Sequence, residues 1–321
     1  MSKASIRMVR IARIVHEALD ICSFEFVDPD GDGLPRFSAG SHIEVHLPNG
    51  LVRQYSLCND PVETHRYQIA VLRDPASRGG SAAMHDLVEG QLIHISEPKN
   101  YFELAADTKR SLLLAGGIGI TPILCMAAQL ESMQAEFELH YCTRSRERTA
   151  FVNRLTSGPL SKRAHLHHDD EAPDQKLDIA NLFATQEPGT HLYVCGPTGF
   201  MTWVLDAARA AGWPEEQLHR EYFAGAPIDT SRNGSFEVQL ASTGAVFRIA
   251  ADQTIVAALA AQGIQLQTSC EQGICGTCLT RVLDGIPDHR DMYLTPDEQA
   301  NGDQFTPCCS RAKSARLLLD L

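Results

Sequence analysis

The sequence predicts a multidomain protein in which an antiparallel β-barrel is followed by an α/β doubly wound domain and a small, β-grasp-like α+β domain. The 321 residues are enough for two or three domains. The first third contains short alternating strands without a long helix, and the middle third alternates apolar strands with helical patterns. Five of the ten cysteines lie in the last 52 residues. The predicted boundaries are 1–106 for the barrel, 107–226 for the doubly wound domain, 227–234 for a linker and 235–321 for the last domain.

Composition excludes several classes of protein. Apolar residues make up 44% and charged residues 21%, which are ordinary globular values. The net charge of −12, from 28 basic and 40 acidic residues, argues against a nucleic-acid binder and a polybasic membrane anchor. The amino terminus has no apolar signal region, and the longest uncharged apolar stretch, 112–128, is shorter than the roughly 20 residues of a membrane span. We therefore expect a cytoplasmic protein whose cysteines are metal ligands, nucleophiles or buried side chains.

Four short alternating segments predict the barrel, at 42–47, 53–57, 68–72 and 91–96. One of these strands reads Arg53-Gln54-Tyr55-Ser56-Leu57, and a later turn reads Arg78-Gly79-Gly80-Ser81. Arginine, backbone amides and a serine hydroxyl suit an anionic phosphate. Tyr55 could lie against an aromatic ring system, with Ser56 donating to a flavin nitrogen. Taken singly, each segment is also typical of an ordinary strand and turn.

A glycine-rich turn predicts a nucleotide site in the doubly wound domain. The apolar run 111–115 predicts a buried parallel strand, and the residues from Gly116 to Pro122 read Gly-Gly-Ile-Gly-Ile-Thr-Pro. Thr121 suits a helix N-cap and Pro122 the first helical position. Free amides and the positive end of the helix dipole would then face a pyrophosphate. Pro122 replaces the third glycine of the complete fingerprint, so a plain strand-to-helix turn is an alternative interpretation.

Two further strands support the nucleotide site. The strand at 137–142 ends in Thr143-Arg144-Ser145, and the strand at 192–195 ends in Gly196-Pro197. Strands that alternate with helices predict a parallel doubly wound sheet, with ligands at the carboxyl ends of the strands. Cys195 suits a position near a nicotinamide and equally a small buried side chain at the end of a strand.

The cysteine spacing is the most specific motif. Cys270, Cys275 and Cys278 form C-x4-C-x2-C, and Cys308 follows after 29 residues. This spacing is that of plant-type [2Fe–2S] proteins. Gly273 and Gly276 allow the backbone to curl so that amides point at sulfur. A zinc site wants two C-x2–4-C pairs, and only Cys275 and Cys278 form one.

The surrounding segments predict a small α+β domain. Residues 236–240 and 246–249 form a predicted hairpin, Thr254 is a predicted N-cap for a helix at 255–262, and 317–319 is a predicted closing strand. The stretch 226–234 contains Pro, Asp, Ser, Asn and Gly without periodicity, as is typical of a linker.

Together these motifs resemble the phthalate dioxygenase reductase family, part of the ferredoxin–NADP reductase superfamily with a plant-type ferredoxin at the carboxyl terminus. The resemblance covers essentially the whole chain. It is carried by the motifs R-x-Y-S, G-G-x-G-x-T-P, C-G-P and C-x4-C-x2-C…C, and by the segments 219–223, 288–292 and 308–314. One departure is Cys309, where the family pattern has an aliphatic residue. Cys309 is therefore a rival of Cys308 as the fourth cluster ligand, and we choose Cys308.

The resemblance implies an NADH-dependent oxidoreductase with three cofactors. A hydride would pass from NADH to FMN, and single electrons would pass through the [2Fe–2S] cluster to a separate Rieske-type oxygenase component. The last transfer is downhill, since plant-type clusters lie near roughly −400 mV and Rieske clusters at roughly −150 to +300 mV. FMN rather than FAD, and NADH rather than NADPH, follow from the resemblance alone. Arg144 could bind a 2′-phosphate or be a surface arginine.

The resemblance also assigns the site residues. The flavin site consists of Arg53, Tyr55, Ser56, Leu57, Arg78, Gly79, Gly80 and Ser81. The nicotinamide nucleotide site consists of Gly117, Gly119, Thr121, Arg144, Cys195, Gly196 and Pro197. The predicted catalytic positions are Ser56, Cys195 and Phe223, with Phe223 shielding the flavin face. The cluster ligands are Cys270, Cys275, Cys278 and Cys308.

Some alternatives remain open. A ferredoxin-like carrier or redox sensor with inert additional domains would contain the same cysteines. The oxygenase partner could act on an aromatic ring, or be a demethylase or quaternary-amine oxygenase. The stretch from His165 to Asp170 (His-Leu-His-His-Asp-Asp) permits a His/carboxylate metal site. We interpret it instead as a polar strand end near the adenosine half of the nucleotide.

Overall fold

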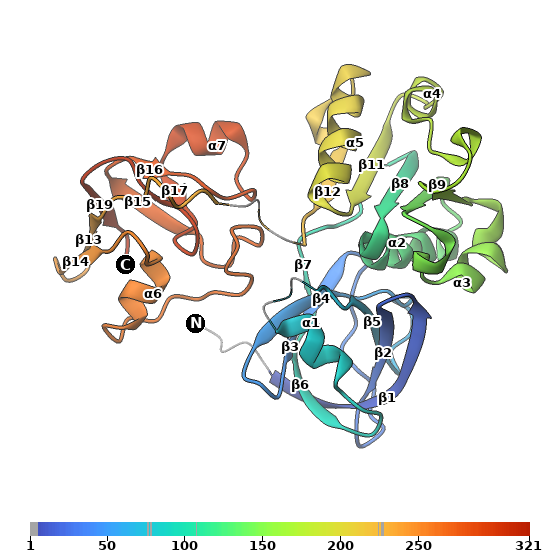
Figure 1. The fold of residues 1–321 in the computed structure, drawn as a ribbon, viewed down its shortest axis with the longest axis horizontal. Helices are drawn as coiled ribbons and strands as arrows, with labels where there is room; N and C mark the ends of the chain where they lie inside the picture. The colour runs from blue at the N-terminus through green and yellow to red at the C-terminus, as the bar shows by residue number, and fades with distance from the viewer. Residues whose placement is uncertain (1–5, 76, 78, 107, 224, 226–227) are drawn as a thin grey trace. The chain divides into compact units, whose positions relative to one another are not determined.

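The computed structural model describes residues 6–75, 77, 79–106, 108–223, 225 and 228–321. The chain divides into two compact units, Met1–Tyr222 and Phe223–Leu321. The first unit contains the barrel and the parallel sheet, and the second contains the cysteine-rich domain (Figure 1). No helix in the described part of the chain is long and apolar enough to cross a membrane.

The barrel is an antiparallel sheet that closes on itself. Its strands are β1 (Ile6–Ala18), β2 (Ile21–Val27), β3 (Ser41–His46), β4 (Val52–Ser56), β5 (Tyr67–Leu72) and β6 (Leu92–Ser96), with the short β7 (Lys99–Asn100) beside β3. The order is β4-β3-β6-β1-β2-β5. Closure comes from the bridge between Leu57 and Ile69 and from the Cys58 amide, which donates to Gln68 O at 2.8 Å. The helix α1 (Gly80–His85) lies between β5 and β6 in the chain.

The barrel confirms the predicted strands and adds three that were missed. The four predicted segments correspond to β3, β4, β5 and β6. The missed strands are the two-residue β7 and the two longest strands of the barrel, β1 and β2, at 13 and 7 residues. In β1 most residues are exposed or half-buried, and Arg7, Arg10 and Arg13 interrupt its apolar positions. The pattern of β1 therefore lacks the regular alternation that identifies a half-buried strand.

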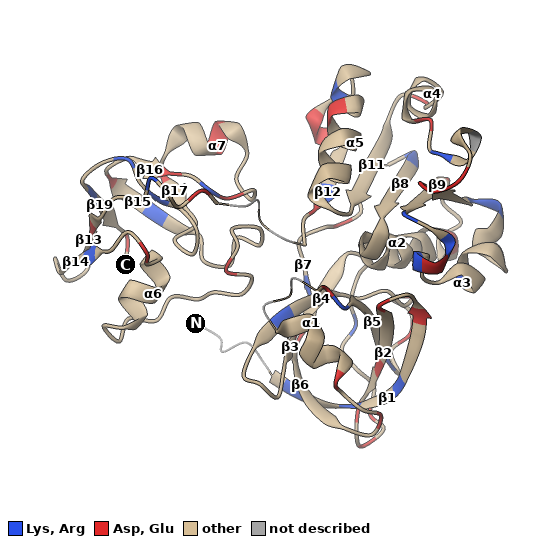
Figure 2. Ribbon diagram, in the orientation of Figure 1, with Lys and Arg blue, Asp and Glu red and all other residues tan. Residues whose placement is uncertain are grey.

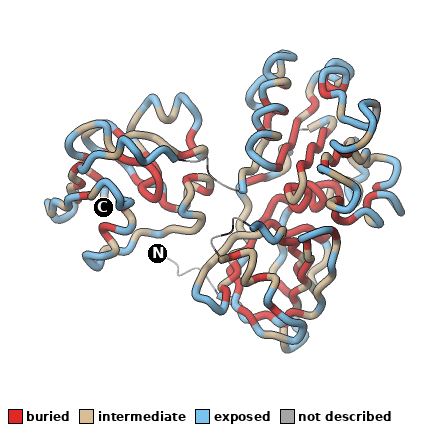
Figure 3. Tube along the Cα trace, in the orientation of Figure 1, coloured by how far each residue is buried: buried red, intermediate tan, exposed pale blue. Residues whose placement is uncertain are grey.

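The other part of the first unit is a five-stranded parallel sheet, as the sequence predicts. Its strands are β8 (Arg110–Gly116), β9 (Phe137–Thr143), β10 (Ala164–His168), β11 (Thr190–Cys195) and β12 (Leu218–Glu221), in the order β10-β9-β8-β11-β12. The helices α2 (Ile120–Ser132) and α3 (Val152–Thr156) pack on one face. The helices α4 (Ile179–Ala184) and α5 (Thr198–Ala210) pack on the other. The central strands are buried on both faces (Figure 3) and carry few charges (Figure 2).

The barrel and the sheet share one core. A single cluster of buried side chains joins barrel residues such as Ile21, Cys58 and Phe102 to residues of β8, β9 and α2. Arg154 of α3 donates to the carbonyl of Cys58 at 2.8 Å, directly after the strand β4. These contacts hold β4 in place against the parallel sheet.

Glycines let the carboxyl ends of β8 and β11 approach closely. A Cβ atom on Gly119 would overlap the carbonyl oxygen of Cys195 and lie 2.6 Å from the Gly196 nitrogen. A Cβ on Gly196 would lie 3.0 Å from the Cα of Gly116. No larger residue fits at these positions without movement of the backbone. The two predicted nucleotide motifs therefore lie in direct contact.

The second unit has the β-grasp-like fold that the sequence predicts. Its main sheet contains β13 (Phe236–Leu240), β14 (Val246–Ile249), β15 (Thr280–Asp284), β17 (Gln304–Phe305) and β19 (Arg316–Leu319), in the order β14-β13-β19-β15-β17. A small ladder pairs β16 (Pro287–Asp288) with β18 (Arg311–Ala312). The first and last long strands, β13 and β19, pair in parallel. The helix α6 (Ile255–Ala260) packs on this sheet.

The helices of this unit differ slightly from the prediction. Thr254 caps α6 as predicted, since its hydroxyl accepts from the Ala257 amide at 3.1 Å, but α6 ends before residue 262. A second helix, α7 (Pro296–Asn301), was not predicted. Its capping box of Thr295 and Glu298 was a readable signal. The described part of the predicted linker contains no helix or strand, and Asn233 accepts from Arg290 at 2.8 Å within the second unit.

We expect Gly119→Ala to destabilise the first unit. The new methyl group would overlap the Cys195 carbonyl, and overpacking of this kind costs about 1–3 kcal/mol. Urea denaturation, followed by tyrosine and flavin fluorescence, measures the free energy of unfolding. Gly199→Ala in α5 is the control, because its Cβ would meet nothing within 4 Å. Equal unfolding midpoints for the two variants would contradict the close packing.

Candidate functional site

The strand β4 presents three polar or aromatic side chains of the predicted flavin site. Arg53, Tyr55 and Ser56 lie on this strand, whose first four residues are only half-buried. Burial raises the pKa of Tyr55 to about 12, against the opposing effect of Arg53, so its phenol is neutral. Leu57 differs from the others, because its side chain is fully buried in the barrel core and its amide donates to Ser41 O at 2.8 Å.

In the turn before α1, which is predicted to bind a phosphate, two backbone amides converge on one oxygen atom. The amides of Gly79 and Ser81 both donate to the hydroxyl oxygen of Ser77, at 3.2 and 3.3 Å. Amides that converge on one oxygen form a concavity suited to an anion. Ser77 was not predicted as part of the site. The Ser81 hydroxyl accepts from the Asp74 amide at 3.1 Å.

Arg53 and this turn lie together. The Nε and Cγ atoms of Arg53 are each 2.8 Å from the position that a Cβ on Gly80 would occupy. The guanidinium is therefore next to the amides that converge on Ser77. Arg78, also predicted here, lies outside the described residues.

A buried histidine adds a polar atom to the same region. His42 of β3 is paired with Ser56 of β4 in the barrel register, and its ring lies 5.6 Å from that of Tyr101. Its Nε2 has no hydrogen-bond partner among the described residues. Burial, followed by the nearby Lys99, lowers the pKa of His42 to about 4, so the imidazole is neutral. This buried, unpartnered nitrogen beside Ser56 suits a hydrogen bond to a polar ligand, and Arg53 with the converging amides suits the phosphate of a cofactor such as FMN.

Ser56 connects the barrel to the parallel sheet through an acid that the sequence did not single out. Its hydroxyl donates to Glu221 Oε2 at 3.0 Å. Glu221 ends β12 and pairs in register with Cys195 at the end of β11. Burial raises the pKa of Glu221 to about 7, while the Ser56 hydroxyl opposes the shift. The position after a buried strand was the available signal, because the ends of parallel strands meet at the ligand site.

Cys195 is a buried neutral thiol. It is fully buried, and desolvation, followed by the charge of Glu221, raises its pKa well above the ordinary value. Such a thiol is a poor nucleophile. The structure therefore brings Ser56, Cys195 and Glu221 together at one corner of the first unit.

The glycine-rich turn lies where predicted, with one correction. Gly119, not Thr121, is the N-cap residue, and α2 begins at Ile120. Thr121 is inside the first turn, and its buried hydroxyl donates to Ile118 O at 3.1 Å. The prediction was wrong because Gly117–Gly119 form a 3-10 turn that starts the helical backbone earlier. Pro122 accordingly falls at the third helical position.

The first turns of α2 and α5 come close together at the carboxyl ends of β8 and β11. Pro197 is the N-cap of α5, and neither helix has a side chain capping its amides. The packing of Gly116, Gly119 and Gly196 brings these amino-terminal turns side by side. Free amides at two helix ends suit a pyrophosphate.

Two other predicted residues are exposed. Arg144 follows β9 and has no ion-pair partner among the residues that the structure describes, whereas its neighbour Arg146 pairs with Glu171. Phe223 is the first residue of the second unit and is 37% exposed. The roles of Arg144 and Phe223 stay predictions.

The four predicted cluster ligands form two sulfur pairs in the second unit. The thiols of Cys270 and Cys275 are hydrogen-bonded to each other, and so are those of Cys278 and Cys308. The amide of Gln272 points at Cys270 Sγ at 3.4 Å, and Gly273 adopts a positive φ of 71°. The loop thus curls around sulfur as the glycines predict. A set of four adjacent thiols, with amides directed at them, has the donor chemistry of a [2Fe–2S] cluster.

Cys309 lies beside this set, and its thiol is hydrogen-bonded to that of Cys308. A Cβ on Gly273 would overlap Cys309 Sγ, and the hydroxyl of Thr306 is 3.2 Å from that sulfur. The segment is anchored by Arg311, which donates to the carbonyls of Gln253 at 2.6 Å and of Gly234 and Ala250 at 2.9 Å each. Cys309 therefore packs behind the loop while Cys308 pairs with Cys278.

Comparisons with known proteins agree with both units. The family described as 2Fe-2S iron-sulfur cluster binding domain matches residues 238–313, and the family described as dimethylamine monooxygenase subunit DmmA-like, N-terminal domain, matches residues 94–218. The chain is 59% identical over 307 residues to a vanillate O-demethylase oxidoreductase of Pseudomonas putida, covering 95% of this chain and 96% of the relative. It is 43% identical over 316 residues to a phthalate dioxygenase reductase of Burkholderia cepacia, covering 98% and 97%.

A solved structure is similar over the full length. The structure of a phthalate dioxygenase reductase, described as modular for electron transfer from pyridine nucleotides to [2Fe-2S], matches with a TM-score of 0.77 and 42% identity. The match covers 98% of each chain. The barrel, the parallel sheet and the cysteine-rich domain therefore occur together in a known arrangement of domains along the chain.

We expect Cys308→Ser to lose the cluster and Cys309→Ser to keep it. Cys308 is hydrogen-bonded to the ligand Cys278 as well as to Cys309, whereas Cys309 contacts Cys308, Gly273 and Thr306 and, among the described residues, is hydrogen-bonded to none of the other predicted ligands. Iron and sulfide analysis and the visible spectrum of each purified variant measure cluster content. Wild-type iron content in Cys308→Ser, with loss in Cys309→Ser, would reverse the assignment.

Proposed function

Because the chain belongs to the phthalate dioxygenase reductase-like family with a carboxyl-terminal [2Fe–2S] domain, we propose that it is the reductase component of an O-demethylase for methoxylated aromatic acids such as vanillate. The observation that carries the proposal is the full-length similarity to vanillate O-demethylase oxidoreductases, which exceeds that to the phthalate reductases. The electron acceptor would be a Rieske-type oxygenase component.

The general activity follows from the family. The protein is an oxidoreductase that takes electrons from NADH and passes them through FMN and a [2Fe–2S] cluster to an oxygenase component. Flavin, when bound, accepts two electrons as hydride and returns them one at a time, as an iron–sulfur acceptor requires. The similarity to these reductases confirms the NADH-dependent electron transfer that the sequence motifs predict. It argues against the alternative of a ferredoxin-like carrier with inert additional domains.

The residues of the first unit would bind the two nucleotides. Arg53 would hold the FMN phosphate, and a phosphate oxygen would replace the Ser77 hydroxyl as the acceptor of the Gly79 and Ser81 amides, with Tyr55 against the ring system. The amides at the starts of α2 and α5 would hold the pyrophosphate of NADH. Gly119 and Gly196 leave room for these contacts, because neither residue places a side chain between the helix ends.

Ser56 and Glu221 would hold a proton beside the site of hydride transfer. Ser56 is positioned by its hydrogen bond to Glu221, so its hydroxyl can change acceptor when a flavin nitrogen is near. A carboxyl group with a pKa of about 7 exchanges a proton readily at neutral pH. Cys195, buried and neutral, fills the adjacent space without acting as a nucleophile.

The experiment for the proposed function has two parts. Anaerobic titration with NADH should bleach the flavin and cluster absorbance of the wild type. In Cys275→Ser, NADH should still reduce the flavin, while reduction of the oxygenase component should fall at least 100-fold, because Cys275 is a predicted cluster ligand. Failure of NADH to bleach either chromophore would contradict the activity itself.

The second part tests the partner. The reductase is mixed with a purified vanillate demethylase oxygenase or a phthalate dioxygenase oxygenase, and product formation is measured with each substrate. We expect at least tenfold faster turnover with the demethylase oxygenase. Equal or faster turnover with the phthalate oxygenase would contradict the substrate assignment and leave the general activity intact.

Glu221→Gln should remove one pH dependence of stability. Burial raises the pKa of Glu221 from 4.5 to about 7, so the folded protein binds this proton more tightly than the unfolded chain. Proton binding by Glu221 therefore adds to the free energy of unfolding. This contribution is complete below pH 4.5 and is lost as the pH rises through 7, which lowers the free energy of unfolding by about 3 kcal/mol. The measurement is the free energy of unfolding of the flavin-free protein between pH 5 and 8. The exposed Glu187→Gln is the control, and identical pH profiles for the wild type and Glu221→Gln would contradict the buried acid.

A further inference from the structure

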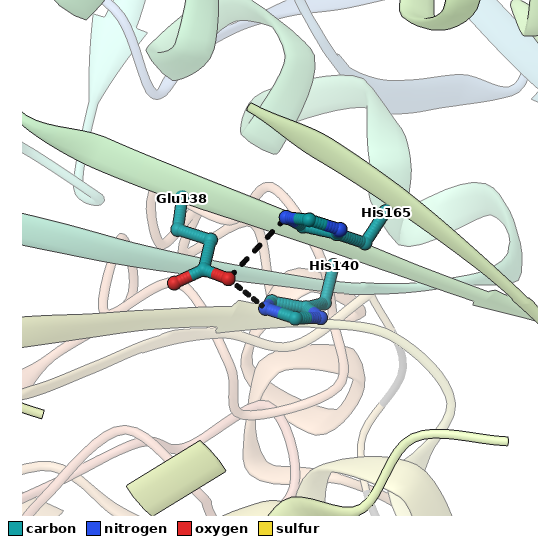
Figure 4. Close-up of side chains that lie close together, drawn as sticks. All are labelled: Glu138, His140 and His165. Carbon is teal, nitrogen blue, oxygen red and sulfur yellow. Dashed lines mark ion pairs between the residues drawn. The ribbon is translucent and has the colours of Figure 1, made fainter. Parts of the chain in front are cut away.

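One face of the parallel sheet carries a cluster of histidines that the proposed function does not use. Glu138 and His140 alternate along β9, and His165 of β10 pairs in register with His140, so all three project from the same face (Figure 4). On this face α4 and α5 cover β8 and β11. Glu138 and the two histidines lie on the neighbouring strands β9 and β10. Glu138 is the second residue of β9, whereas Arg144 follows the opposite end of that strand.

The three side chains have the spacing of metal ligands. Glu138 Oε1 lies 3.1 Å from His140 Nε2 and 3.3 Å from His165 Nε2. The three ligand atoms lie within 4.8 Å of one another. Zinc–nitrogen and zinc–oxygen bonds of about 2.0–2.2 Å place neighbouring ligands about 2.9–3.5 Å apart. The two distances from Glu138 Oε1 fall in this range, and the wider spread of 4.8 Å among the three ligand atoms would narrow when an ion binds.

A hydrogen bond to His167 occupies one of the two ring nitrogens of His140. The carbonyl of Gln175 can only accept, so His167 donates to it from Nδ1 at 3.1 Å. His167 Nε2 lies 2.9 Å from His140 Nδ1 and forms a hydrogen bond with it. The other ring nitrogen of His140, Nε2, faces the Glu138 carboxylate at 3.1 Å.

The His140 Nε2 atom is placed as a metal ligand would be. His140 is 7% exposed, and its Nε2 has no hydrogen-bond partner among the described residues, although the Glu138 oxygen is 3.1 Å away. A metal ion between this buried nitrogen and the carboxylate would contact both atoms. Metal-binding histidines commonly form a hydrogen bond to a supporting group through their other ring nitrogen, as His140 does with His167.

The surroundings orient the carboxylate and leave an entry path. Arg110 Nη2 contacts the other oxygen, Glu138 Oε2, at 3.1 Å, which leaves Oε1 toward the imidazoles. Glu138 and His165 line an open cavity of about 450 Å³, and the His165 side chain is 48% exposed. The cavity also contains Arg110, Lys162 and Arg163, whose charges oppose cation binding. Two imidazole ligands favour a transition metal over magnesium or calcium.

We propose that Glu138, His140 and His165 bind one divalent transition-metal ion of the Zn²⁺ type, separate from the iron–sulfur cluster. The ion would connect β9 to β10, the edge strand of the sheet. Three protein ligands leave at least one position for water. This site replaces our interpretation of 165–170 as only a polar strand end, because the ligands that complete it, Glu138 and His140, lie on another strand.

The test is zinc uptake by the holoprotein. The protein with its full iron and sulfide content is equilibrated with Zn²⁺ against a competing chelator, and metals are counted by mass spectrometry. We expect one zinc per chain in the wild type and at least tenfold weaker uptake in Glu138→Gln and in the half-exposed His165→Gln. Equal iron content in all proteins shows that zinc has not entered the cysteine site and that the variants are folded.

The same sheet offers a matched control. His191 and His219 stack on the opposite face, with Nδ1 and Nε2 2.8 Å apart, and they belong to no group of three ligands among the described residues. We expect His191→Gln to take up zinc like the wild type. X-ray absorption at the zinc edge should show nitrogen and oxygen neighbours without sulfur at about 2.3 Å.

Three results would overturn the proposal. They are wild-type zinc uptake in Glu138→Gln and His165→Gln, zinc–sulfur scattering in the holoprotein, or no stoichiometric zinc. In the last case, nitrogen NMR of a doubly protonated His140 would identify a proton as the cation beside Glu138. None of these results bears on NADH oxidation, so the proposed function is judged independently.

Discussion

The close approach of the backbones at the ends of β8 and β11 is the constraint on which the first unit depends. Gly119 touches the Cys195 carbonyl, and Gly196 touches Gly116, so two segments about 80 residues apart in sequence share one corner. This contact brings the starts of α2 and α5 together. Through the register of β11 and β12 it also places Cys195 beside Glu221, and Glu221 reaches Ser56 on the barrel. The predicted nucleotide and flavin sites therefore adjoin at this corner, where Ser56 and Glu221 are hydrogen-bonded.

The two redox sites are built in different ways. The predicted flavin site uses strand residues that the barrel register and the shared core hold in place, so its precision comes from the sheet. The cluster site uses thiols on a loop, where backbone turns and amides decide the geometry. Arg311 compensates for the lack of regular structure by binding three backbone carbonyls next to the Cys308 segment. A buried arginine with its donors satisfied is a stable anchor for an irregular segment.

The parallel sheet presents polar groups in two places, at the carboxyl ends of its strands and on the face over β9 and β10. Its carboxyl ends supply the turns suited to nucleotides, which is the usual location in such sheets. Its face over β9 and β10 carries charged and polar side chains where β8 and β11 carry leucine and valine packed under α4 and α5. A surface free of helix cover tolerates histidine and glutamate, and strand register sets the distances between them. The proposed ion site is therefore separate from the corner predicted to bind nucleotides.

The sequence alone determined the order of the folds along the chain, the grouping of the cysteines on one loop, and the glycine-rich turns; the cysteine ligand set stays a prediction. These features depend on short spacings, because thiols on one loop, or glycines in one turn, must lie within a few residues of each other. Tertiary structure decided the rest. Glu221 joins Ser56, and Glu138 and His140 join His165, only because strands distant in sequence pair in a particular register. The start of α2 at Ile120 rather than after Thr121, and the position of Cys309 behind Gly273, likewise depend on packing around the turn. Local patterns restrict which backbone shapes are possible, whereas contacts across strands are chosen by the burial and pairing of the whole sheet.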